Sequence, residues 1–210
     1  MTRIDRARFF ASIRKTLFAG RLQEGQVGGI NAILDAWERE MAGCDRRFLA
    51  YMLATVYHET ARTMAPVRET LAASDDEAIA ILDAAWARGK LRWVKKRYWR
   101  RDGDGKTWLG RGLVQLTHKQ NYLRLGAAIG VDLVADPGRA MAMDVAVAIL
   151  FAGMVDGLFT GRRLADCFNP ARADWTAARR IITGPESAAR VAGHALAFDR
   201  ALALADGTHF

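Results

Sequence analysis

Apolar residues recur along most of the chain at the 3.6-residue spacing of amphipathic helices. The first such stripe joins Phe10, Ile13 and Leu17, and its helix is expected to end near Gly20. Similar stripes predict further helices at 30–41, from 48 onward, and at 79–86, 122–129, 143–154, 175–182 and 189–204. Few runs alternate apolar and polar residues with β-branched side chains, so a large sheet is not expected. The pattern predicts a mainly helical fold.

Polar and glycine-rich segments separate these stripes. Ser74 stands where an N-cap is expected for the helix at 79–86. The segment from Lys90 to Gly112 breaks the periodicity and is predicted to be a loop or a short hairpin. No apolar run reaches the roughly 18 residues of a membrane-spanning helix. We expect one domain over residues 1–210, with its core at about 46–200.

Composition and charge narrow the kinds of partner. The 210 residues are 51% hydrophobic and 26% charged, which suits a protein with one substantial core. The net charge of +8 favours polyanions such as nucleic acid, acidic lipid or an anionic bacterial envelope. The first residues do not resemble a signal peptide. We therefore expect the protein to be made and kept in the cytoplasm of the producing cell unless something else releases it.

Cysteine and histidine give no sign of a metal or cofactor. Cys44 and Cys167 are too few for a disulfide framework and are predicted to be buried thiols. The histidines lack the spacing of zinc ligands. Residues 102–106 begin like a calcium loop, but Lys106 stands at the third ligand position, so a turn is predicted.

One carboxylate lies on an apolar helix face. Phe48, Met52, Val56 and Glu59 follow at steps of four, four and three, and therefore share one side of a helix. Apolar neighbours favour the neutral form of a carboxyl group, which is what a general acid requires. The alternative is a helix-end glutamate that turns to solvent or pairs with Arg62. Periodicity alone favours this alternative.

A second acid, Glu69, follows Pro66, which is expected to end the helix and turn the chain. Paired carboxylates across a cleft are the usual equipment for cleaving a glycosidic bond. Glu69 as a surface residue that balances an arginine is the alternative. Asp75, Asp76 and Asp104 compete as second acids.

Residues 110–117 form a glycine-flanked motif, Gly-Arg-Gly-Leu-Val-Gln-Leu-Thr. Its alternation predicts a short strand-like stretch with Gln115 and Thr117 on one side, where their polar groups bind sugar hydroxyls or a water. Taken alone, the motif is weak.

The combination of His58-Glu59-Thr60, the motif at 110–117 and Asn121-Tyr122 resembles glycoside hydrolase family 19. That family includes plant-type chitinases and many bacteriophage endolysins, and the similarity is greatest to the phage or prophage endolysin branch. The resemblance implies a lysozyme-like helical fold with a substrate cleft. It also implies a glycosidase that needs no metal or cofactor.

The resemblance also implies roles for individual residues. Glu59 is the general acid and Glu69 the base that activates water in an inverting displacement, which requires the two carboxyl groups to lie about 6.5–9.5 Å apart. Thr117 helps to place the water. The implied substrate-binding residues are His58, Gln115, Asn121, Tyr122 and Arg111, although bracing of the loop or pairing with a carboxylate suits Arg111 better, and His58 is better explained as a structural neighbour of the acid.

Two features depart from the family pattern. Thr183 stands before Gly184 where the family usually has Asn, which puts one sugar contact in doubt. The insert from about Ser74 to Arg101 is longer and more basic than expected. It contains an aromatic-basic run whose cations are candidates for an anionic envelope component, namely Lys95, Lys96, Arg97, Arg100 and Arg101.

The leading hypothesis is therefore an enzyme that cleaves the β-1,4 bonds of peptidoglycan strands and is released by a membrane pore protein. A chitinase acting on N-acetylglucosamine polymers is the nearest alternative. A basic helical nucleic-acid-binding protein is the alternative from another class, but it leaves Glu59 unexplained, and we expect no stable nucleic-acid complex. A lysozyme-fold protein without activity is disfavoured by the presence of Glu59, Gln115 and Thr117.

Overall fold

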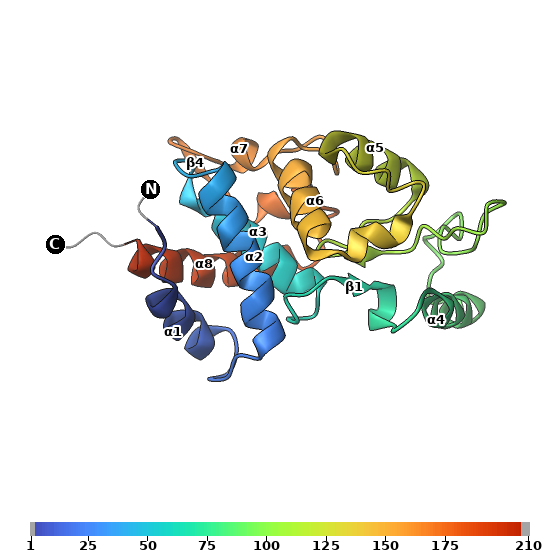
Figure 1. Ribbon diagram of the computed structural model, residues 1–210, viewed down its shortest axis with the longest axis horizontal. Helices are drawn as coiled ribbons and strands as arrows, with labels where there is room; N and C mark the ends of the chain where they lie inside the picture. Colours follow the sequence, from blue (N-terminus) through green and yellow to red (C-terminus); the bar gives the residue numbers. More distant parts are fainter. Residues whose placement is uncertain (1–2, 207–210) are drawn as a thin grey trace. The chain divides into compact units, whose positions relative to one another are not determined.

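The computed structural model describes residues 3–206, which group into two compact units (Figure 1). The first unit comprises residues 3–64 and 153–206, and the second comprises residues 65–152. The division falls within helix α6 (Met143–Val155). The fold is mainly helical, as the sequence pattern predicts. One domain over the whole chain stays a prediction.

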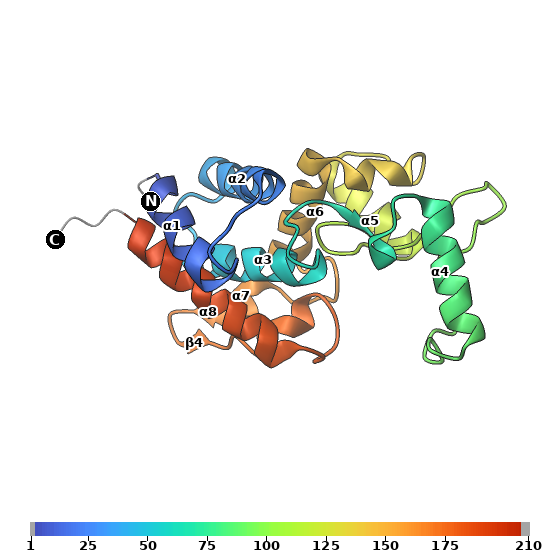
Figure 2. The same ribbon diagram turned by 90° about the horizontal axis from the view of Figure 1, so that it is seen from below.

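The first unit is built from helices that surround α3. It contains α1 (Arg6–Thr16), α2 (Glu24–Glu40), α3 (Arg46–Glu59), α7 (Leu164–Cys167) and α8 (Ala188–Ala205). Helix α8 packs against both α3 and α1 (Figure 2). Residues 49–57 of α3 are buried without interruption, so this helix passes through the core instead of lying on its surface. Its end is therefore a well-fixed place for a functional side chain.

The segment at 175–182 differs from the predicted helix. It forms only the 3-10 turn η3 (Ala177–Ile181), after a two-residue pairing of β3 (Phe168–Asn169) with β4 (Arg172–Ala173). The turn starts where the Asp174 carboxylate accepts the amide of Ala177 at 2.8 Å. Pro185 follows closely, and a proline disfavours helical backbone at the residue before it. The helix is therefore cut short from both sides.

The second unit contains one pair of short strands. The first, β1 (Val67–Arg68), pairs antiparallel with β2 (Arg111–Gly112), which follows α4 (Asp75–Ala87) in the chain, so that Val67 lies opposite Gly112. The remaining elements are η1 (Glu69–Leu71), α4 (Asp75–Ala87), α5 (Lys119–Ile129), η2 (Pro137–Met141) and α6 as far as residue 152. The Ser74 hydroxyl accepts the amide of Glu77 at 3.1 Å, which confirms the predicted N-cap.

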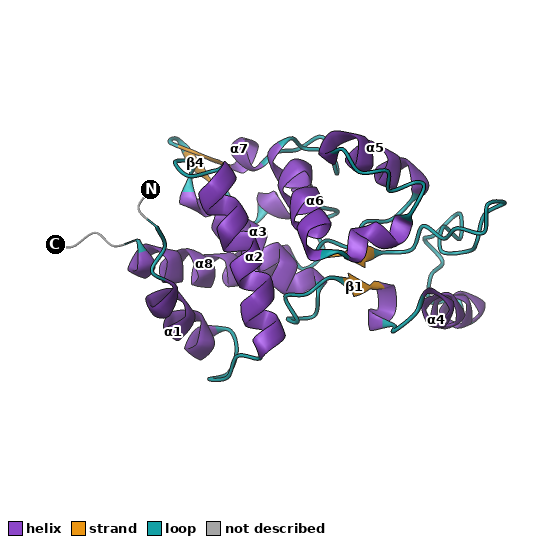
Figure 3. Cartoon of the chain, viewed as in Figure 1, coloured by secondary structure: helices purple, strands orange, loops and turns teal. Residues whose placement is uncertain are grey.

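Residues 88–110 contain no helix or strand, which confirms the predicted loop (Figure 3). Its course is set by a small core in which Trp99 packs with Leu82 and Leu109. The Trp99 indole donates a hydrogen bond to Asp83 of α4 at 3.0 Å. The predicted turn at 102–106 is also present, because Asp102 accepts the amides of Asp104 and Lys106.

Two further predictions concern the burial of the cysteines and membrane-spanning helices. Cys167 is buried, but Cys44 is exposed, because it lies in the short connection between α2 and α3 instead of on a packed face. No helix within the described part of the chain is long and apolar enough to cross a membrane.

Candidate active site

The last residue of α3 carries the first candidate acid. Glu59 is 15% exposed at its side chain, and its Oε1 atom accepts a hydrogen bond from Arg179 of η3 at 2.5 Å. Its Oε2 atom has no hydrogen bond to any residue that the structure describes. One oxygen is thus fixed while the other is open to a ligand.

Arg179 is itself held within the first unit. Its side chain is only 7% exposed, and its Nε atom donates to the carbonyl of Glu186 at 3.2 Å. A buried guanidinium with a carboxylate partner is more rigid than a surface pair, since water competes less for its donors. The expected alternative partner, Arg62, instead lies over the ring of Tyr57 at 5.8 Å.

Helix α3 ends before the proline that was expected to stop it. The helix closes at Glu59, where the Thr60 hydroxyl donates to the Val56 carbonyl and accepts the amide of Met64. Ala61, Arg62 and Met64 then have positive φ angles, between 49° and 73°. The chain therefore turns through left-handed residues before Pro66 is reached, and Glu59 lies at the helix terminus.

His58 lies beside the acid and is half-buried. Burial lowers the pKa of His58, the negative charge of Glu59 opposes that effect, and Arg179 and Arg190 add to it. The imidazole is therefore neutral near pH 7, which suits a hydrogen-bonding neighbour better than a second cation.

Glu69 is fixed at the start of η1 in the second unit. Its amide donates to the Gly110 carbonyl at 2.7 Å, and its Oε2 atom accepts the amide of Gly110 at 2.7 Å. The Tyr98 hydroxyl donates to Oε1, also at 2.7 Å. Burial and the negative charge of Glu69 raise the pKa of Tyr98, so this hydroxyl remains a donor at neutral pH. One backbone–backbone hydrogen bond and two bonds to the carboxylate thus hold Glu69 in one orientation.

The competing second acids have structural roles. Burial opposes ionisation of Asp75, but hydrogen bonds and the charges of Arg111 and Arg68 outweigh it and lower the pKa of Asp75. Asp76 pairs with Arg101 at 2.6 Å and is 82% exposed. Asp104 lies on the surface of the turn at 102–106, 3.8 Å from Lys119.

The motif at 110–117 does not form the strand-like stretch that its alternation suggested. Only Arg111 and Gly112 are in a strand, and the amide and carbonyl of Arg111 exchange hydrogen bonds with those of Leu116 around a tight turn. Gln115 has a positive φ of 54°, and its amide donates to the Val67 carbonyl at 3.0 Å. The turn buries the intervening apolar residues on one side, because Leu113 and Val114 both enter the core.

Thr117 and Asn121 differ in how free their side chains are. Within the described residues the Thr117 hydroxyl has no hydrogen-bond partner, so it is available to a water or a substrate. Asn121 is occupied: its amide donates to the Thr117 carbonyl at 2.8 Å, and its oxygen accepts from Arg124 at 2.5 Å. It thereby shapes the beginning of α5.

Tyr122 is buried behind the motif and differs from the expected sugar contact, whereas Arg111 braces the loop and pairs with a carboxylate, as its alternative role predicts. The Tyr122 hydroxyl donates to the Leu109 carbonyl at 2.7 Å and accepts from Arg111 at 2.9 Å. Arg111 is 2% exposed and pairs with Asp75 at 2.6 Å. Both residues therefore support the turn from inside.

Two site residues were missed by the sequence reasoning. Arg179 lies 120 positions after Glu59, and near it the comparison with the family pattern marks only Thr183 and Gly184. Tyr98 belongs to the aromatic-basic run, and nothing in its position in the sequence indicates a bond to Glu69. Both contacts are long-range, so periodicity does not report them.

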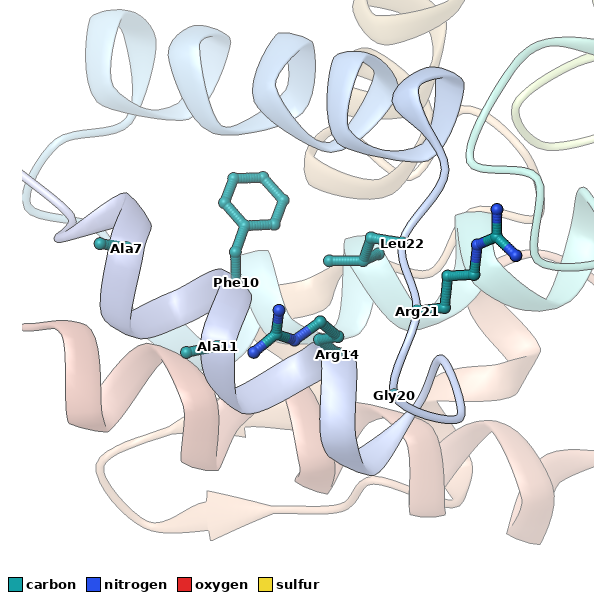
Figure 4. A pocket seen from close by; sticks show the side chains of 7 residues that line it. All are labelled: Ala7, Phe10, Ala11, Arg14, Gly20, Arg21 and Leu22. Carbon is teal, nitrogen blue, oxygen red and sulfur yellow. The ribbon is translucent and has the colours of Figure 1, made fainter.

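The hollow drawn in Figure 4 lies away from these residues, in the first unit. It has a volume of about 480 Å³ and lies between α1 and the segment that leads into α2, with Phe10 and Leu22 on its walls. It holds arginines but no carboxylate. In the described part of the chain no group of three or more His, Cys, Asp or Glu residues is placed to hold a metal ion.

Glycosidases that work by acid–base chemistry use two carboxyl groups, and Glu59, partly buried with one oxygen free of hydrogen bonds to the described residues, is a candidate for one of them. The chain belongs to glycoside hydrolase family 19, because the model of that family, described as chitinase class I, matches residues 44–195. It is therefore a chitinase-like glycosidase. No curated protein and no solved structure matches the chain.

Proposed function

We propose that this glycosidase hydrolyses the β-1,4 glycosidic bonds of bacterial peptidoglycan, as a member of the phage or prophage endolysin branch of its family. The observation that carries the choice of substrate is the basic run 95–101, whose cations are exposed and in which Lys95 and Lys96 have no acidic partner in the described chain. Peptidoglycan strands carry peptide carboxylates, whereas chitin is neutral. A positive surface favours the anionic polymer.

Glu59 is the general acid of this proposal. Arg179 fixes the carboxyl group through Oε1, and Oε2 carries the proton to the glycosidic oxygen as the bond from that oxygen to the anomeric carbon breaks. His58 stays neutral beside it and contributes a hydrogen bond to the substrate.

Glu69 is the general base. It removes a proton from a water whose oxygen forms the new bond to the anomeric carbon, so that one water is consumed and two sugar ends are released. A carboxylate has about four acceptor positions, and Tyr98 and Gly110 use two of them. The open hydroxyl of Thr117 positions the water, and the remaining candidate, Gln115, supports the loop around it.

Chitin is the second candidate substrate, since the family model that matches is described as chitinase class I. Both polymers have β-1,4-linked N-acetylated sugars and require the same acid and base. They differ in charge, so substrate charge is the property to vary in the assay.

In the producing cell, the enzyme accumulates in the cytoplasm and is released to the cell wall by a membrane pore protein, and its function is host lysis. It acts as a monomer and forms no stable complex with nucleic acid.

The test compares wild type with Glu59→Gln on permeabilised Gram-negative cells, on purified peptidoglycan and on a soluble chitin oligomer. We expect loss of turbidity and release of reducing ends with wild type, and a fall of about 10²–10⁴-fold in Glu59→Gln. Glu24→Gln, the same change at an exposed glutamate without a side-chain partner, is the matched control.

Two results would contradict the proposal. A folded wild type that releases no reducing ends from peptidoglycan but cleaves the chitin oligomer identifies a chitinase. Equal losses in Glu59→Gln and Glu24→Gln would remove Glu59 from the chemistry.

A further inference from the structure

The whole excess of positive charge comes from one segment of the second unit. Residues 88–101 contain eight Lys or Arg residues and no Asp or Glu, so the rest of the chain has 23 of each sign. This segment forms most of the loop after α4. A net charge confined to one loop creates a local positive potential, which a charge spread evenly over the surface does not.

The later part of this loop lines a cavity of about 700 Å³, which lies entirely in the second unit. Its walls combine cations with aromatic rings. The cations are Lys96, Arg97, Arg100, Arg101 and Lys119, and the rings belong to Tyr98, Trp108 and His118. A cavity of this size accommodates a group of a few tens of atoms, such as a short peptide attached to a sugar.

The acids near the cavity do not neutralise all of these cations. Asp83 pairs with Arg100 at 2.8 Å, also accepts the Trp99 indole, and lies 3.9 Å from Arg97, so one carboxylate serves two guanidinium groups. Lys96 has no acidic partner in the described chain. Lys96 is therefore an unpaired exposed positive charge, and Arg97, which shares Asp83 and lies 5.8 Å from the centre of the Trp86 ring, is only partly neutralised.

The one acid in the cavity wall, Asp102, is used by the protein itself. It accepts the Trp108 indole at 2.9 Å and two backbone amides of its own turn. Lys119 approaches it only at 3.5 Å and lies over the Trp108 ring at 5.2 Å. Asp102 thus shapes the wall, and its oxygens are occupied by groups of the protein.

The cavity is connected to the proposed base. The ring of Tyr98 lies 4.3 Å from the ring of His118 in the cavity wall, and its hydroxyl donates to Glu69 at 2.7 Å. Tyr98 therefore has its ring in the cavity wall and its hydroxyl on the proposed base, although Glu69 itself does not line the cavity.

We infer that this cavity binds the carboxylates of the peptide carried by a peptidoglycan strand, with Lys96 and Arg97 as the residues that select an anionic strand over a neutral one. This inference rests on the proposed function. An anionic membrane surface is the competing ligand, since Trp93 of the same loop is 74% exposed. The cavity favours the glycan because Tyr98 ties its wall to Glu69, whereas Trp93 is not part of that wall.

The test is a binding titration of the full chain with a disaccharide-tetrapeptide released from peptidoglycan, either with free carboxylates or with the carboxylates amidated. Wild type should bind the free form about 10-fold more tightly than the amidated form, because charge-assisted hydrogen bonds are lost on amidation. The double variant Lys96→Gln/Arg97→Gln should bind both forms equally. Arg14→Gln/Lys15→Gln removes an adjacent exposed pair in α1 and should behave as wild type.

Equal binding of both forms by wild type would overturn the inference, as would a preference that survives in the Lys96→Gln/Arg97→Gln variant. Vesicles containing phosphatidylglycerol form a separate arm. Vesicle binding that disappears in this variant, without any preference for the charged fragment, assigns the loop to a membrane and also overturns the inference. Unchanged thermal unfolding shows that each variant is folded.

Failure of the proposed function is a different result. If wild type releases no reducing ends from peptidoglycan, the proposed substrate is wrong whatever the titration gives. If it does release them but the titration shows no charge preference, only the cavity assignment is wrong.

Discussion

Arg179 donates a hydrogen bond to Glu59 at 2.5 Å and reaches it from a 3-10 turn that lies 120 residues further along the chain. Arg179→Ala would leave the partly buried carboxylate without its partner. We expect a loss of up to about 3 kcal/mol in the free energy of unfolding and a fall in kcat of at least about 10²-fold, since the acid is no longer oriented.

Unfolding in urea and initial rates on peptidoglycan measure these two effects. Arg180→Ala is the control, because it removes an exposed arginine from the same turn. Retention of full activity in a folded Arg179→Ala variant would show that the proton transfer from Glu59 does not depend on this contact.

Glu69→Gln tests the second acid. Glutamine keeps an oxygen that accepts from Gly110, so the loop should remain folded, but it cannot take a proton from water. We expect kcat to fall about 10²–10⁴-fold with little change in thermal stability. Addition of azide, a small external nucleophile, should restore part of the rate. Unaltered turnover in this variant would assign the base to another residue.

Glu59 shows how much of the candidate site can be predicted from the sequence. The stripe of Phe48, Met52 and Val56 correctly predicts a helix that brings an acid to a buried end. It does not show that an arginine shares the site, because η3 meets α3 only through the tertiary fold. Residues that are close in the sequence make their contacts through local periodicity, whereas contacts across 120 residues depend on packing of the whole unit.

The backbone of the motif at 110–117 could not be predicted from the sequence pattern. Alternation suggested a strand through Gln115 and Thr117, but positive φ angles at Gln115 and His118 fold the motif into a turn. Left-handed backbone is uncommon outside glycine, and propensity rules assign it no signal here. Likewise, the resemblance predicts that Tyr122 contacts a sugar, whereas its side chain is buried behind the motif. The separation of Glu59 and Glu69 stays a prediction.

Gly112 tests the backbone geometry of the motif. Its φ is 85°, and an added methyl group would lie 2.8 Å from the carbonyl oxygen of Ala140. Gly20 has almost the same φ, 86°, with open space around it. Both alanine variants lose about 1 kcal/mol from backbone strain, and Gly112→Ala should lose at least about 1 kcal/mol more from the clash. Thermal unfolding of the two variants separates these terms. Equal losses would mean that the Ala140 segment moves aside freely.

Asp75 gives a pH-dependent prediction. The pKa of Asp75 is lowered in the folded protein, so the unfolded chain takes up this proton at a higher pH. Stability from the pairs with Arg111 and Arg68 is present above the unfolded pKa of about 3.9 and is lost as pH falls through the folded pKa.

Asp75→Asn should therefore destabilise the protein by about 2–4 kcal/mol at pH 7, with a smaller difference from wild type near pH 3. Urea unfolding at the two pH values measures this. Asp76→Asn changes an exposed neighbour and should cost less than about 1 kcal/mol at either pH. A difference at Asp75 that does not change with pH would assign the effect to packing instead of charge.

His194 gives a second pH-dependent prediction, for stability between pH 5 and pH 7. Burial lowers the pKa of His194, and the nearby charges of His58, Arg62 and Arg190 add to this. Stability from the neutral ring is present above its unfolded pKa of about 6.5 and falls as the pH decreases through the lower folded pKa. In His194→Leu the decrease of Tm between pH 7 and pH 5 should be smaller than in wild type. An identical decrease would show that this histidine does not contribute to acid sensitivity.

Two hydrogen bonds between Glu69 and Gly110 join the two ends of a long segment of the chain. The chain leaves at Glu69, runs through α4 and the basic loop, and returns to the same point at Gly110. Leu91 and Val94 of this segment pack against the core around Trp99, whereas the exposed residues 95–97 can change in charge while the two ends stay joined. Under the proposed function, exchange of these exposed cations should alter substrate preference without moving Glu69, which makes them the place to redirect the enzyme to a differently charged polymer.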